Sequence, residues 1–179
     1  MAREKLGRSA QPTLLIVDAQ SVKNTDTARY KGYGAGKKVS GIKRHIAVDT
    51  QGLPHAIAVT TADVTDRKGA LQAMRRCKAS LGKVQTVLAD AGYVGEPFAL
   101  GVREILGQAA AVKIANRSEL HKFAVIPKRW VVERSFAWLE KKQAVVEKLR
   151  AAAQHQPAVC PSGVSGPFAQ KIVDTFLQA

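Results

Sequence analysis

Two short, continuously apolar runs that each end in an aspartate constrain the fold of this chain most strongly. The first is Leu14–Val17 before Asp18, and the second is Val87–Ala89 before Asp90. Such runs predict buried strands, so both acids are expected at strand ends. A third acid, Glu133, lies in a segment with the pattern of a helix. Two acids at strand ends and one on a late helix supply the oxygen ligands that a two-metal phosphoryl-transfer site needs.

The other predicted elements complete one α/β domain with a mixed sheet. Ile42–Asp49 and Pro54–Thr60 flank the turn signal Thr50-Gln51-Gly52 and are expected to form a hairpin. Asp66 is expected to be the N-cap of a helix over residues 67–80. Further strands are expected at 13–18, 84–90 and 109–115, with helices at 97–106 and from Pro127 onward.

The charge balance predicts a polyanionic partner. The chain has 28 Lys and Arg against 14 Asp and Glu, a net charge of +14, while an apolar fraction of 46% is typical of a folded domain. The glycine-rich loop Lys31–Lys38 matches neither of the common phosphate-loop patterns. Four basic residues in and after this loop are expected to contact the phosphate backbone: Lys37, Lys38, Lys43 and Arg44. No membrane span or signal peptide is expected, because the chain has no sufficiently long apolar run.

Four sequence blocks, in order, resemble the DDE transposases of bacterial insertion sequences, chiefly the insertion-sequence-five and insertion-sequence-four types. The blocks span residues 16–23, 41–49, 88–93 and 129–138, and the resemblance covers residues 7 to about 142. A further block shared with such transposases contains Asp66. The resemblance implies an RNase H-like fold, with a mixed β-sheet flanked by helices.

The resemblance also implies a catalytic triad of Asp18, Asp90 and Glu133. Asp18 would bridge two Mg²⁺ (or Mn²⁺) ions, with Asp90 on one ion and Glu133 on the other. The implied reaction cleaves DNA at the transposon ends and then joins a freed 3′-hydroxyl to target DNA. A homodimer on DNA and a bacterial, nucleoid-associated cytoplasmic location are implied in the same way.

Basic residues beside Glu133 are further candidates for DNA contact. Arg129 precedes Glu133 by four residues and therefore shares its helix face, and Arg134 follows it directly. Arg129 is expected either to orient the Glu133 carboxylate or to contact a phosphate. Families of this type often carry a basic residue seven positions after the glutamate, whereas this chain has Glu140, with Lys141 and Lys142 adjacent.

The expected organisation has three parts: a basic flexible lead-in at 1–12, the catalytic domain at 13–142 and an atypical tail at 143–179. The resembled transposases carry a helical DNA-binding region before the first aspartate, and an upstream reading frame is one expected source of it. The tail is rich in Ala, Gln and Pro. The tail from Gln143 onward can be back-translated with codons that, read one base later, encode a polar stretch followed by an apolar helix. Our hypothesis is therefore that a frameshift near residues 141–143 produced this tail. Both departures raise the alternative that the isolated chain is inactive, so its activity stays open at this point.

Each acid taken alone has a plainer interpretation. An aspartate at a strand end commonly forms a turn or caps a helix, and Glu133 alone reads as a solvated helix carboxylate. Two other functions therefore stay open: a non-catalytic DNA-binding remnant, and a metal-dependent nuclease of the same fold. Loss of strand transfer on replacing Asp18 with Asn would exclude the first, and activity on DNA without terminal repeats and without joining would favour the second.

Overall fold

The computed structural model describes residues 2–5, 7–23, 31–115, 129–141 and 158–159. Its strands are β1 (Leu14–Lys23), β2 (Gly32–Gly34), β3 (Val39–Val48), β4 (Pro54–Thr61), β5 (Thr86–Ala89), β6 (Ala111–Ile114) and β7 (Ala158–Val159). Its helices are α1 (Ala2–Lys5), α2 (Asp66–Arg76), α3 (Glu96–Leu106) and α4 (Arg129–Lys141), with 3₁₀ turns at Lys78–Ser80 and Ala91–Tyr93.

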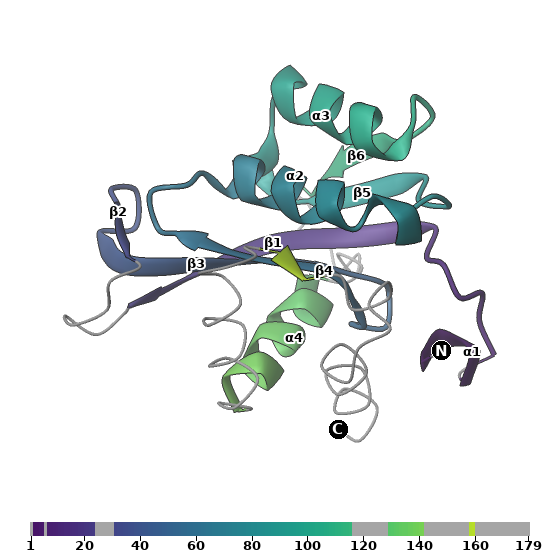
Figure 1. The fold of residues 1–179 in the computed structure, drawn as a ribbon, viewed down its shortest axis with the longest axis horizontal. Coiled ribbons are helices and arrows are strands. Elements are labelled where there is room, and N and C mark those ends of the chain that lie inside the picture. Colours follow the sequence, from purple (N-terminus) through teal and green to yellow (C-terminus); the bar gives the residue numbers. More distant parts are fainter. Residues whose placement is uncertain (1, 6, 24–30, 116–128, 142–157, 160–179) are drawn as a thin grey trace, which may run out of the picture.

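The strands form one mixed sheet in the order β6-β5-β1-β3-β4-β7, with β2 paired to β3. β1 runs antiparallel to β3 and parallel to β5, and β5 runs parallel to β6. Helices α2 and α3 cover one face of this sheet, and α4 lies on the other (Figure 1). The predicted α/β class, a mixed β-sheet flanked by helices, is confirmed.

Alternation along β1 and β3 divides the apolar core between the two faces of the sheet. Leu15 and Val17 belong to the larger cluster, which includes residues of α2 and α3. Ile16 belongs to the second cluster, which includes Val131 and Val132 of α4. Because successive side chains of a strand point to opposite faces, Asp18 shares the α4 side of the sheet with Ile16.

Several boundaries differ from those predicted. β1 continues five residues past Asp18 to Lys23, and β2 forms inside the segment expected to be a loop. The predicted cap of α2 was wrong: Thr65 is the N-cap, and its side chain accepts a hydrogen bond from Lys68 N at 3.3 Å. Asp66 begins the helix instead, where a carboxylate is favourable beside the helix N-terminus.

Central strand β3 buries three consecutive residues whose side chains are polar or charged. Lys43, Arg44 and His45 are 8%, 5% and 0% exposed, because both faces of β3 are covered. Lys43 Nζ pairs with Asp66 Oδ1 at 2.9 Å and donates to Val64 O at 2.7 Å. Both side chains are therefore buried in the sheet, whereas the sequence predicted that they contact the phosphate backbone.

His45 is a neutral core residue, so acid should destabilise the fold. Its Nε2 lies 2.9 Å from Thr60 Oγ1, and that hydroxyl donates to Thr61 O. Thr60 must therefore accept from Nε2–H, which leaves Nδ1 as the buried, unprotonated nitrogen without a partner in the described residues. Burial lowers the pKa of His45 from 6.5 to about 4; the negative charge of Asp66 opposes this shift, and the positive charges of Lys43 and Lys37 add to it.

The unfolded chain therefore binds this proton at a higher pH than the folded chain does. Neutral His45 should make its full contribution to the free energy of unfolding above pH 6.5. This free energy should fall by about 3 kcal/mol as the pH drops to about 4. Urea unfolding at a series of pH values measures this fall. A His45→Gln variant should show a flatter profile across the same window, and an equally steep profile would assign the loss to another group.

The expected domain boundaries fall largely outside the described residues. These exclude Pro127 and the tail apart from residues 158–159, which pair with β4. In the lead-in expected to be flexible, Arg3 is instead buried and pairs with Asp49.

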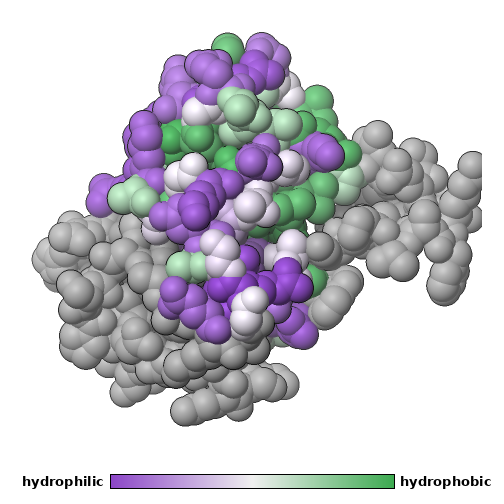
Figure 2. All heavy atoms as spheres, turned by 90° about the vertical axis from the view of Figure 1, so that its right-hand side faces the viewer, coloured by the Kyte–Doolittle hydropathy of each residue, from purple (hydrophilic) through white to green (hydrophobic). Residues whose placement is uncertain are grey.

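On the face turned to the viewer in Figure 2, hydrophilic residues run from top to bottom between smaller apolar areas.

Candidate active site

The parallel pairing of β1 with β5 brings Asp18 and Asp90 to neighbouring positions. The register places Ile16 opposite Leu88. Continuing it by two residues places Asp18 opposite Asp90, the residue directly after β5. Both side chains are partly exposed, and both line a small cavity of about 20 Å³ together with Val132 of α4.

Glu133, on α4, lies with Asp18 at a second cavity, which Asp90 does not line. The two residues line an open cavity of about 420 Å³, together with Gln20, Ser21, Lys37 and Phe136. Burial of Val131, Val132 and Phe136 against the sheet fixes this helix and leaves Glu133 exposed. Asp18 therefore lines a cavity with each of the other two predicted acids.

Both aspartates also have local structural roles, as the plainer interpretation expected. Asp18 Oδ1 accepts a hydrogen bond from Ala19 N at 2.7 Å. Asp90 caps the 3₁₀ turn that follows it, and its Oδ1 accepts from Gly92 N at 2.9 Å. These bonds orient each carboxylate, so capping and ligand binding are compatible uses of the same residue.

The donor set fits divalent metal ions in its chemistry. Three carboxylates offer the hard oxygen atoms that Mg²⁺ and Mn²⁺ prefer. Among the residues that the structure describes, no group of three His, Cys, Asp or Glu side chains is close enough to hold one ion. A two-ion site does not require such a group, because one shared carboxylate and one further carboxylate for each ion suffice as protein ligands. Asp18 lines both cavities, so it is the carboxylate placed to be shared.

Tyr93 lies close to the same acids, although no function was expected for it from the sequence. Its hydroxyl is buried and has no hydrogen-bond partner among the described residues. Burial raises the pKa of this phenol, and the negative charges of Asp18, Asp66 and Asp90 raise it further.

The predicted DNA-contacting residues separate into groups. Lys37 and Lys38 are exposed, and Lys37 lines the larger cavity. Lys43 and Arg44 are buried, with Arg44 Nη1 lying 3.4 Å from Gln20 Oε1. The side chain of Arg129 lies outside the described residues. Arg134 is exposed, and its Nη2 donates to Gln51 O at 2.9 Å.

Gln20 and Ser21 are cavity residues that the sequence reasoning missed. Their position follows from the extension of β1 beyond Asp18. The signal was available in the alternation of the strand, because Gln20 stands two residues from Asp18 and therefore on the same side of the sheet.

Comparison with known proteins identifies the family of the chain. A family model described as the transposase DDE domain matches residues 9–155. A Burkholderia cepacia protein whose assigned role is transposase for insertion sequence element IS402 is 33% identical over 106 residues, which cover 55% of this chain and 49% of the relative. The matched part thus spans about half the length of that curated relative.

A solved structure, a simian T-cell lymphotropic virus intasome in complex with PP2A regulatory subunit B56 gamma, aligns with a TM-score of 0.49 and 15% identity. The alignment covers 93% of this chain and 48% of that chain. No helix among the described residues is long and apolar enough to cross a membrane. On the family match over residues 9–155, the chain belongs to the transposases with a DDE domain.

Proposed function

We propose that this domain catalyses metal-dependent cleavage of DNA at transposon ends and transfer of the cleaved strand to target DNA, with Asp18, Asp90 and Glu133 as metal ligands. The observation that carries the proposal is the shared position of Asp18, which lines one cavity with Asp90 and another with Glu133. An arrangement of one central and two outer carboxylates is suited to two divalent ions, Mg²⁺ or Mn²⁺.

The residues of this chain would act by binding and positioning. Asp18, Asp90 and Glu133 supply the anionic oxygens, and the bound ions would activate the attacking hydroxyl and neutralise charge on the transferring phosphate. Lys37 places a positive charge at the same cavity, where it can contact the DNA backbone. Lys38 extends this positive surface. Lys43 and Arg44 are buried and are not part of the proposal.

A strand-transfer assay tests the proposed function. The chain is incubated with a supercoiled plasmid and with duplex oligonucleotides copied from the two flanks of its gene, each with a 3′-hydroxyl at the element end. Joined products that require Mg²⁺ or Mn²⁺ and disappear with EDTA are expected. Cleavage of any DNA without joining would support the nuclease instead, and DNA binding without cleavage or joining would support the non-catalytic remnant.

A further inference from the structure

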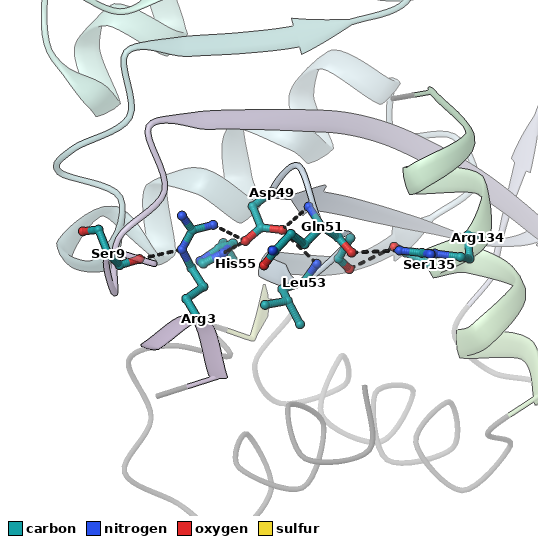
Figure 3. Close-up of polar contacts among 9 residues, drawn as sticks. Arg3, Ser9, Asp49, Gln51, Leu53, His55, Arg134 and Ser135 are labelled. Atoms are coloured by element: carbon teal, nitrogen blue, oxygen red, sulfur yellow. Dashed lines mark hydrogen bonds and ion pairs between the residues drawn. The ribbon is translucent and has the colours of Figure 1, made fainter. Parts of the chain in front are cut away.

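The position of α4 depends on contacts with a turn that is distant in the sequence. Arg134 Nη2 donates to Gln51 O at 2.9 Å, and Ser135 Oγ lies 3.0 Å from Gly52 O and 2.9 Å from Val131 O. Arg134 and Ser135 directly follow Glu133 in α4. The carbonyls of Gln51 and Gly52 belong to the turn between β3 and β4 (Figure 3), whereas that of Val131 belongs to α4 itself.

Asp49 shapes this turn from inside the protein. It is 1% exposed, and its Oδ1 accepts from Gln51 N at 2.8 Å and Leu53 N at 3.1 Å. Its Oδ2 contacts Arg3 Nη1 and lies 3.3 Å from His55 Nε2. One buried carboxylate thus fixes two backbone amides of the turn, and two basic side chains flank it (Figure 3).

Gly52 completes the fit between the turn and α4. Its φ of +87° lies in the left-handed region, which favours glycine. A Cβ at this position would lie 3.2 Å from Ser135 Oγ and 3.2 Å from Val131 Cγ1. The turn and helix therefore approach more closely than a side chain at residue 52 would comfortably allow.

We propose that the β3–β4 turn, residues 49–53, is a positioning element for Glu133, acting through Ser135 and Arg134. This inference rests on the proposed function, because it assigns to the turn the placement of one proposed metal ligand. The contact of the buried Ser135 Oγ with Gly52 O fixes the distance of the helix from the turn and its rotation about its own axis. The Arg134 contact restrains the adjacent, exposed side of the helix.

Replacing Ser135 with Ala tests the proposal without altering a proposed metal ligand or DNA contact. The helix would lose its buried bond to Gly52 O, and Glu133 would be less well placed. Outer partners that orient metal ligands typically contribute about 10–100-fold to metal affinity or activity. Mn²⁺ affinity, measured by electron paramagnetic resonance, should therefore weaken by about 10-fold or more, while affinity for duplex DNA should be unchanged.

Two variants separate positioning from general loss of stability. Ser80→Ala removes a similar hydroxyl-to-carbonyl bond, from Ser80 Oγ to Cys77 O at 2.9 Å, away from the site, and should leave Mn²⁺ affinity unchanged. Ser135→Thr keeps the hydroxyl that lies 3.0 Å from Gly52 O and should restore affinity. Thermal unfolding monitors the folded state of each variant.

The outcomes distinguish failure of this inference from failure of the proposed function. If Glu133→Gln binds Mn²⁺ more weakly than the wild-type protein but folded Ser135→Ala binds it equally well, the turn does not position Glu133 and the inference is wrong. Equal weakening in Ser80→Ala and Ser135→Ala would also overturn it. If wild-type protein binds no Mn²⁺, the proposed function itself fails.

Discussion

Replacing Asp18 with Asn should abolish strand transfer while leaving DNA binding intact. The substitution is nearly isosteric, and the Asn side-chain oxygen can still accept the bond that Asp18 Oδ1 receives from Ala19 N. It removes the negative charge from the residue that lines both cavities. Mutation of a residue that only orients a metal ligand typically lowers activity by about 10–100-fold. The loss of joined product should exceed this range, because Asp18→Asn removes a shared ligand directly.

DNA affinity should stay the same or increase, since the variant has one fewer negative charge to repel the phosphate backbone. Asp63→Asn is the matched control, because Asp63 is an exposed carboxylate that lines neither cavity. It should retain wild-type strand transfer. Joined product at the wild-type rate from Asp18→Asn would remove Asp18 from the proposed mechanism.

Replacing Gly69 with Ala should destabilise the domain strongly, although alanine normally favours a helix. A Cβ on Gly69 of α2 would overlap the ring of His45, which is fully buried. Moving the ring would disturb its bond to Thr60. Overpacking costs about 1–3 kcal/mol and an unsatisfied buried group another 1–3 kcal/mol, against a helix-propensity gain of about 1 kcal/mol. The free energy of unfolding should therefore fall by about 3 kcal/mol.

Gly101→Ala in α3 is the matched control for this prediction. A Cβ there would lie 2.7 Å from Leu71 Cδ1, which is the end of a flexible side chain that can turn away. Urea unfolding of both variants should show a much larger loss for Gly69→Ala than for Gly101→Ala. Similar values for the two would mean that His45 and α2 rearrange at little cost.

The sequence predicted the sheet well where a strand is continuously apolar. Leu14–Val17 and Val87–Ala89 form strands whose positions bring Asp18 and Asp90 together, as expected. Pro97 lies in the first turn of α3, as predicted for the start of a helix. These features depend on local composition, so they can be recognised without knowledge of the tertiary structure.

Features that depend on distant partners were not predictable in this way. The run Lys43-Arg44-His45 has the composition of an exposed strand, yet α2 and α4 cover opposite faces of β3 and bury it. Asp49 also ended a predicted strand, but its partners Arg3 and His55 come from separate segments. The contact between Ser135 and Gly52 spans 83 residues. Such contacts have no local sequence signal.

The most direct test of the central claim is the number of Mn²⁺ ions bound per chain, measured by electron paramagnetic resonance with duplex DNA present. We expect two ions for the wild-type protein. Asp18→Asn should weaken both, whereas Asp90→Asn and Glu133→Gln should each weaken one. Binding that is unchanged in all three variants would contradict the assignment of these carboxylates as the metal site.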